Sequence, residues 1–330
     1  SFLNIKLPFR KQDSTTSIPL DIIPDFTPYK HQSLSFDRLT SKAGHIPEPT
    51  LITTGTGSGK TECFLYPILD HVARNQSKPG IKALILYPMN ALAFDQARRI
   101  AKLIFGHPPL NNQTTVGMYV GGKGATKTMG PDFVITDKET LQQNPPDILL
   151  TNYKMLDYLL LRPEDQTLWK DNTPETLRYI VLDELHTYDG VQGGDVACLL
   201  RRLRAKLHAT DGAITPIGTS ATLSNDDSEA QVDLANFAQN IFGTSIPETS
   251  IITEDRLSAA EFFPKTPKRK KLPIVSDKMR TLDTDDIAKY IERQTTLWFG
   301  SSDNDPLLVG QMVLEHHFTR TVFDVLDNRV

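Results

Sequence analysis

The sequence is poor in cysteine. Its 330 residues include only Cys63 and Cys198, which stand far apart and outside any CxxC or histidine-rich stretch. This spacing argues against a zinc site and favours a reducing, cytoplasmic setting. Both cysteines fall in segments with helical spacing, so we expect them to pack in the core.

Long apolar runs and a strong net charge are also absent. No run approaches the ~18 uninterrupted apolar residues of a membrane-spanning helix. The N-terminal SFLNIKLPFRKQ lacks the charged-then-apolar order of a signal peptide. Neither a membrane nor export is therefore indicated. Lys plus Arg (36) and Asp plus Glu (40) leave a net charge of -4, so a nucleic-acid partner requires a local basic surface.

Short apolar segments alternate along the chain with longer segments of helical spacing. The predicted strands lie at residues 51–53, 83–87, 116–120, 147–151, 179–182 and 214–218. Helices are predicted at residues 61–74, 91–104 and 196–207. This alternation predicts an α/β fold in which helices cover both faces of a parallel sheet.

The pattern changes after residue 222, where helical segments near 229–241, 285–299 and 306–326 are separated by the loop-like PKTPKRKKLP at 264–273. We expect three parts: an N-terminal extension (1–25), the α/β domain (26–225) and a mainly helical appendage or connector (226–330). The basic run is expected to be a solvated loop. It consists of Lys265, Lys268, Arg269, Lys270 and Lys271.

A glycine-rich loop, TGTGSGKT at 54–61, joins a predicted strand to a predicted helix. Its glycines let backbone N–H groups turn toward phosphates, and the helix N-terminus adds partial positive charge. Lys60 supplies a cation for the phosphates and Thr61 a hydroxyl for Mg²⁺. The pattern GxxxxGKS/T fails only at Thr54, and the alternative is a simple turn. The predicted ATP-binding residues here are Thr54, Gly55, Thr56, Gly57, Ser58, Gly59, Lys60 and Thr61.

An acidic pair, Asp183 and Glu184, follows the apolar strand YIVL in the sequence DELH. Ligands of α/β proteins bind at this carboxyl edge of the sheet. Asp183 is suited to hold Mg²⁺, and Glu184 to orient and deprotonate an attacking water. The alternative is a pair of surface acids, which the preceding phosphate loop makes less favoured.

The sequence TSAT at 219–222 follows the next predicted strand. Small hydroxyl side chains at a strand end are suited to relay contacts between the acidic pair and another surface. The alternative is a turn or a helix N-cap. From the order of the three motifs, we expect His186, Ser220 and Thr222 to act in coupling.

From about residue 26 to 222, the sequence resembles superfamily 2 helicases of the DEAD/DEAH class. FTPYKHQ at 26–32 is similar to the Q motif of that family. The resemblance implies a RecA-like first motor domain that uses ATP and Mg²⁺. It also implies that Gln32 bonds the adenine edge beside an aromatic such as Tyr29 or Phe26, which the donor and acceptor of a glutamine amide allow.

Two further segments resemble the motifs that grip the sugar-phosphate backbone in such helicases. YPMNALA lies within the segment 84–96 and TNYKML spans 151–156. The implied strand contacts are Pro88, Asn90, Thr151 and Asn152, with strand-end turns and N-caps as the alternative. The glycine-rich excursion from 121 to 146 adds Lys123, with Lys127, as further candidates.

The spelling of these motifs is similar to that of large bacterial RecQ-like, Hrq-type and Lhr-like helicases, some of which serve in anti-phage defence. A complete motor of this class has a second RecA-like domain with an arginine finger, and no second parallel sheet is evident here. Because the chain begins with Ser1, we expect it to be a fragment of a longer protein. We expect DNA, rather than RNA, as its nucleic-acid partner, and other defence subunits as further partners.

Three functions are consistent with parts of this pattern. The favoured one is an ATP-driven helicase or translocase. An ATP-dependent switch or scaffold that binds nucleic acid without unwinding it is the second. A P-loop enzyme of another class, such as a kinase, would not need Gln32 or the TSAT sequence.

Overall fold

The computed structural model describes residues 7–13, 15–55, 57–111, 113–122, 124–221, 228–263, 287–302 and 305–327. The chain divides into two compact units. One is Lys11–Asp255, and the other combines Ser1–Arg10 with Arg256–Val330. Among the described residues, no helix has the length and apolarity that crossing a membrane requires.

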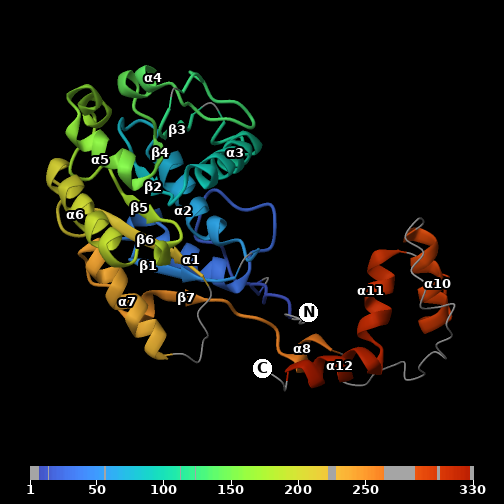
Figure 1. Cartoon of the computed structure of the whole chain (residues 1–330). Helices are drawn as coiled ribbons and strands as arrows, with labels where there is room; N and C mark the ends of the chain where they lie inside the picture. The colour runs from blue at the N-terminus through green and yellow to red at the C-terminus, as the bar shows by residue number, and fades with distance from the viewer. Residues whose placement is uncertain are drawn as a thin grey trace. The chain divides into compact units, whose positions relative to one another are not determined.

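The larger unit is built around a parallel sheet of seven strands (Figure 1). The strands are β1 (Thr50–Thr53), β2 (Ala83–Leu86), β3 (Val116–Tyr119), β4 (Ile148–Thr151), β5 (Tyr179–Leu182), β6 (Thr215–Ser220) and β7 (Ile251–Thr253). Their order is β3-β4-β2-β5-β6-β1-β7, and every neighbouring pair is parallel. The six strands expected from the sequence are present with small shifts at their ends.

The inner strands are buried along their whole length because helices cover both faces of the sheet. Successive side chains point to opposite faces, so Ile52 enters one core and Leu51 the other. This explains why the strands are continuous apolar runs instead of alternating apolar and polar residues.

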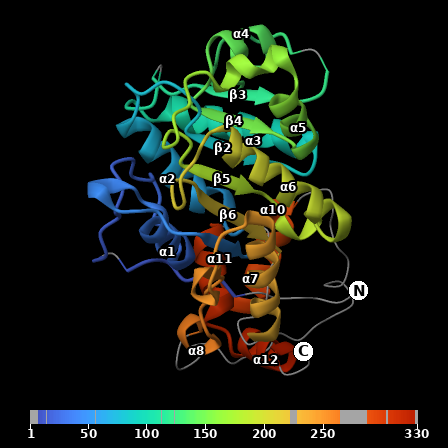
Figure 2. The ribbon, with the colours of Figure 1, turned by 90° about the vertical axis from the view of Figure 1, so that its left-hand side faces the viewer.

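Two groups of helices form the covering layers, as Figures 1 and 2 show. On one face lie α1 (Lys30–Leu39), α2 (Lys60–Arg74) and α3 (Asn90–Gly106), which bury Phe36, Ile68 and Ile100. On the other lie α5 (Tyr153–Leu161), α6 (Gly190–Lys206) and α7 (Ser228–Phe242). The remaining helical segments of the unit are α4 (Lys138–Gln143) and the 3-10 turns Lys42–Gly44, Pro163–Trp169, Leu185–Thr187 and Glu248–Ser250.

The larger unit extends past both ends of the expected domain at 26–225. On the N-terminal side, Leu20 and Ile22 are buried in the core, and the Asp70 carboxylate accepts hydrogen bonds from the Asp21 and Ile22 amides at 2.6 and 2.9 Å. On the C-terminal side, β7 pairs with β1. A three-residue edge strand is too short to give a periodic signal, which is why the sequence did not reveal it.

The described part of the smaller unit is mainly helical. Its helices are α8 (Ala259–Phe262), α10 (Ile287–Phe299), α11 (Pro306–Leu314) and α12 (His317–Asp327). The single helix expected at 306–326 is therefore wrong. His316 Nδ1 accepts a 3.1 Å hydrogen bond from the Phe318 amide and so caps the first turn of α12. Histidine is not among the usual capping residues, so this break between α11 and α12 was not predictable from the residue pattern. The basic run within 264–273 lies outside the described residues.

Candidate functional site

The glycine-rich loop leaves β1 at the carboxyl edge of the sheet and enters α2 at Lys60. Within the loop, Thr54 Oγ1 and Ser58 Oγ lie 2.6 Å apart, and the Ser58 amide donates to Gly55 O at 3.3 Å. Gly59 has a φ of 78°, and a Cβ there would lie 2.3 Å from Gln32 Nε2. The positive φ therefore favours glycine at this position, and a larger residue would also have to displace the Gln32 side chain. Thr56 lies outside the described residues.

The Lys60 ammonium joins the loop to the ends of two neighbouring strands. Lys60 Nζ donates to Ser220 O at 3.1 Å and lies 3.6 Å from Glu184 Oε1. Thr61 follows in the first turn of α2, so its hydroxyl belongs to the same helix N-terminus. The cation, the hydroxyl and the exposed N–H groups of a helix start form a site suited to anionic oxygen atoms.

Thr219 holds the acidic pair in place from the end of β6. Its hydroxyl donates to Asp183 Oδ1 at 2.5 Å and accepts from the Glu184 amide at 3.0 Å. Burial raises the pKa of Asp183 above its usual range, and the Thr219 hydrogen bond acts in the opposite direction. Glu184 has a φ of 51°, a left-handed conformation that is uncommon for a residue other than glycine.

His186 links the acidic pair to the strand that bears the TSAT sequence. Its Nδ1 lies 3.5 Å from Glu184 Oε2 and 3.2 Å from Ser220 Oγ. The structure therefore brings together His186 and Ser220, two of the three residues expected to act in coupling. The third, Thr222, lies outside the described residues.

Helix α1 packs its N-terminal turn against the phosphate loop. The Gln32 side chain accepts from the Tyr29 amide at 2.9 Å and donates to Gly59 O at 3.2 Å. His31 Nε2 donates to Ser58 O at 2.9 Å. A glutamine amide offers two hydrogens and two lone pairs, so the oxygen and the nitrogen of Gln32 each keep one position for another group.

These elements line an open cavity of about 410 Å³ at the carboxyl edge. It is lined by Phe26, Tyr29, Gln32, Gly55, Gly57, Gly59, Lys60, Thr61, Glu62, Leu92, Gln96, Arg99, Asp183 and Glu184. The lining therefore combines the Q-motif-like residues, the glycine-rich loop and the acidic pair. The volume of the cavity lies within the range of small-molecule sites.

The candidate strand contacts divide into two kinds. Asn152 Nδ2 donates to Asn90 Oδ1 at 2.7 Å, and Asn152 Oδ1 caps α5 by accepting from the Met155 amide. Pro88 is half-buried beside them, while Asn90 is exposed. The expectation that Thr151 contacts a nucleic-acid strand is wrong. Thr151 is fully buried, and its hydroxyl donates to Tyr119 O at 2.5 Å, so a strand cannot reach it. Lys123 lies outside the described residues, and Lys127 is exposed.

Several site residues were not identified from the sequence. Thr219 lay inside the quoted TSAT sequence, which was the available signal. Glu254 accepts a 2.9 Å hydrogen bond from the Gly55 amide, but it follows the unrecognised strand β7. Arg99 pairs with Glu62 at the wall of the cavity. A helical arginine and glutamate so far apart in sequence give no local signal.

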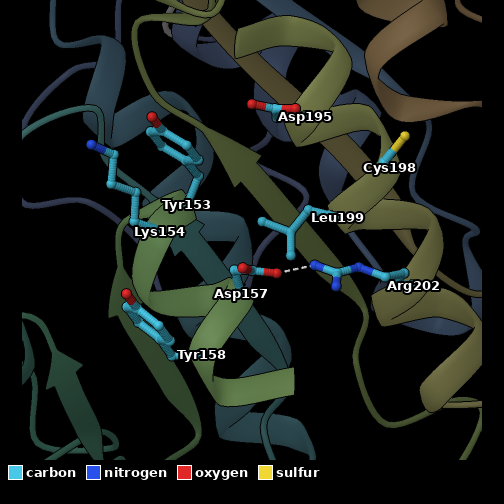
Figure 3. A pocket seen from close by; sticks show the side chains of 8 residues that line it. All are labelled: Tyr153, Lys154, Asp157, Tyr158, Asp195, Cys198, Leu199 and Arg202. Carbon is cyan, nitrogen blue, oxygen red and sulfur yellow. Dashed lines mark hydrogen bonds and ion pairs between the residues drawn. The ribbon is translucent and has the colours of Figure 1, made fainter. Parts of the chain in front are cut away.

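A second hollow of about 410 Å³ lies between α5 and α6 (Figure 3). Asp157 and Arg202 form an ion pair between its two walls. Cys198 also lines it and is exposed, so the expectation that this cysteine packs in the core is wrong. Helix α6 buries Leu199, Leu200 and Leu203 instead, which turns Cys198 outward. Cys63 is buried as expected.

The fold and the cavity together define a P-loop NTPase domain with a RecA-like parallel sheet. In this sheet the phosphate loop follows β1, the acidic pair follows β5, and β6 lies between the two strands. Residues 29–230, well over half of the chain, match the DEAD/DEAH box helicase family. The chain belongs to this family and contains its ATP-binding motor domain. This confirms the resemblance on which the expected fold, nucleotide use and nucleic-acid binding rested.

The sequence is similar to part of several much longer proteins. The Druantia protein DruE of Escherichia coli (strain UMEA 4076-1) is 29% identical over 71% of this chain and 19% of its own length. The uncharacterized ATP-dependent helicase YprA of Bacillus subtilis (strain 168) is 32% identical over 60% of this chain and 23% of its own length. The chain thus spans about a fifth of each.

Solved structures support the fold. The DUF1998 helicase MrfA bound to DNA and AMPPNP superposes with a TM-score of 0.51 at 22% identity, covering 88% of this chain and 36% of MrfA. At this level of identity the similarity concerns the fold alone.

Proposed function

We propose that the cavity binds ATP with Mg²⁺ and hydrolyses the nucleotide to drive a nucleic-acid motor. The observation that supports this most is the convergence of Lys60 and Glu184, 3.6 Å apart, in one cavity with the glycine-rich loop. In the proposal, the loop N–H groups and Lys60 bind the phosphates, while Gln32 and Tyr29 bind the adenine.

The residues present fit Mg²⁺. The Thr61 hydroxyl and the Asp183 carboxylate are hard oxygen donors, the type that this ion prefers. Asp183 is half-buried and lines the same cavity as the Lys60 cation, an arrangement suited to a bound cation and phosphate charge in one place. When bound, Mg²⁺ supplies neutralisation of phosphate charge. Thr61 and Asp183 would hold it.

Glu184 is the proposed general base. Its carboxylate lies between Lys60 and His186, and the hydrogen bond from the Glu184 amide to the Thr219 hydroxyl holds its backbone in place. From this position it orients a water and takes a proton from it as the water oxygen bonds to the γ-phosphorus. The bond from that phosphorus to the β–γ bridging oxygen breaks in the same step, so ADP leaves with the bridging oxygen. Arg99 and Glu62 close one wall of the cavity.

We propose that His186 and Ser220 couple this chemistry to a strand bound near Asn90, Asn152 and Pro88. Contacts to phosphate and sugar of this kind tolerate any base sequence. DNA is the favoured partner. The proposal assigns Lys11–Asp255, which extends the expected 26–225 at both ends, to the first motor domain. The chain from Arg256 onward is assigned to the connector toward a second RecA-like domain in the full-length protein. Without an arginine from that domain, this chain alone should turn over ATP ~10³- to 10⁵-fold more slowly.

The test uses the full-length protein and its ATPase rate with and without single-stranded DNA. Lys60→Ala should abolish turnover because the phosphate-binding cation is lost. Glu184→Gln should also abolish it but keep ATP binding, measured with a fluorescent ATP analogue. Lys78→Ala, an exposed lysine just beyond α2, is the matched control and should behave as wild type. Normal turnover in Glu184→Gln would exclude Glu184 as the base.

Strand displacement separates the two candidate activities. A helicase should separate a partial duplex in an ATP-dependent manner. DNA-stimulated ATPase without displacement would favour the switch or scaffold. A role in anti-phage defence, with other subunits of a defence complex, stays a proposal for the whole protein, and plaque counts with and without its gene would test it.

A further inference from the structure

Residues 250–255 contact two elements of the proposed ATP site, the glycine-rich loop and helix α1. β7 pairs in parallel with β1, with Leu51 opposite Ile251 and Thr53 opposite Thr253. The next residue of each strand, Thr54 and Glu254, therefore leaves the sheet at the same edge. The register places an acidic side chain directly beside the entrance of the phosphate loop.

Glu254 fixes the base of that loop. Its Oε2 accepts from the Gly55 amide at 2.9 Å, and the Gly55 carbonyl accepts from the Ser58 amide at 3.3 Å. Gly55 is buried and thus held at both its N–H and its C=O groups. A hydrogen bond to a carboxylate is stronger than one between neutral groups, so the Glu254 bond is the more important restraint.

The same segment also contacts α1. Asp255 Oδ2 lies 2.7 Å from Lys30 Nζ, and Ser250 Oγ accepts from Arg38 at 3.3 Å. The Lys30 and Asp255 side chains are 51% and 31% exposed, so this ion pair contributes little. Of these contacts, that of Glu254 with the loop has the largest expected effect.

We propose that Glu254 is a positioning residue for ATP, which acts by holding Gly55 so that the following loop amides are ordered before the phosphates arrive. The proposal rests on the ATP site proposed above. Order that exists before binding removes part of the entropy cost of binding. Glu254 lies beyond residues 29–230, the part that matches the helicase family, and the chain enters its second unit at the next residue but one.

The test compares Glu254→Ala with Glu254→Gln in the full-length protein by steady-state ATPase kinetics. Loss of a hydrogen bond to a charged group should raise KM for ATP about tenfold in Glu254→Ala. The kcat should change by less than about twofold, because Lys60 and the acidic pair are held by β6 instead. Glu254→Gln retains an acceptor and should restore most of the affinity. Glu248→Ala, an exposed glutamate just before β7, is the control.

Thermal unfolding without nucleotide should distinguish this effect from general destabilisation. If Glu254→Ala does not fold, Glu254→Met is tested in its place, because methionine has a similar side-chain volume and lacks the carboxylate acceptor. An unchanged or lower KM in a folded variant without the acceptor would overturn the proposal. Absence of ATPase in the wild type would instead refute the ATP site itself, so the two failures are distinguishable.

Discussion

The replacement Thr219→Val tests how the acidic pair is held. Valine has nearly the shape of threonine but lacks the hydroxyl, so it removes both the bond donated to Asp183 and the bond accepted from the Glu184 amide. Thr219 is fully buried, and water cannot easily replace either bond. The substitution therefore changes hydrogen bonding with little change in packing.

The expected magnitude follows from these two bonds. A hydrogen bond to a charged group contributes about 1.5–3 kcal/mol, and a buried donor left without an acceptor costs about 1–3 kcal/mol. Glu184 also has a left-handed backbone, which the bond to its amide helps to retain. When this bond is lost, the Glu184 carboxylate should move away from Lys60. If about half of the total appears in the barrier, kcat falls roughly 10- to 100-fold.

The assay is ATP turnover by the full-length protein at saturating ATP and DNA, with the thermal midpoint measured in parallel. Thr219→Ser keeps the hydroxyl and should retain activity within a fewfold of wild type. If Thr219→Val folds and its kcat stays within twofold of wild type, Thr219 does not position the acidic pair.

Two other predictions concern the adenine side and acid stability. Gln32→Ala should lower the affinity for ATP more than the affinity for a pyrimidine triphosphate, measured by competition binding. Equal losses of affinity would mean that Gln32 serves only to bond Tyr29 and Gly59. Burial, with nearby positive charges, lowers the pKa of His71 to about 3. An unfolded histidine titrates near 6.5, so the unfolded state takes up a proton first. Stability from this group is present above pH 6.5 and is lost as the pH falls toward 3, by roughly 2 kcal/mol at pH 5. Measured by urea unfolding, the loss of stability between pH 7.5 and 5 should be roughly 2 kcal/mol smaller in His71→Asn than in wild type. Equal losses in the two proteins would contradict the lowered pKa of His71.

The sequence predicted the sheet and the centre of the site because both depend on local patterns. Buried parallel strands are short apolar runs, and the glycine-rich loop and DELH each follow one of them directly. The topology rule that ligands bind at the carboxyl ends of such strands then brings Lys60 and Glu184 together without any structural information.

Contacts that depend on register or on long-range packing were not predictable. Glu254 reaches Gly55 only because β7 pairs with β1, and β7 has no periodicity of its own. Thr151 ends a strand, as a candidate strand contact should, yet its side chain turns toward Tyr119 and is buried. Cys198 lies in an amphipathic helix whose buried face could not be assigned at one-residue precision.

The end of β6 connects the parts of the proposed motor more directly than the acidic pair does. Thr219 bonds both acids, Ser220 O accepts from Lys60, and Ser220 Oγ contacts His186. A displacement of these two residues would therefore alter the phosphate-binding cation and the proposed base together. Asn90 begins α3, and Leu92, Gln96 and Arg99 of the same helix line the cavity. If strand binding at Asn90 stimulates hydrolysis, a shift of α3 can act on the cavity wall directly and through the Arg99–Glu62 contact with α2. The end of β6 would then transmit a change between the phosphate-binding cation and the acidic pair.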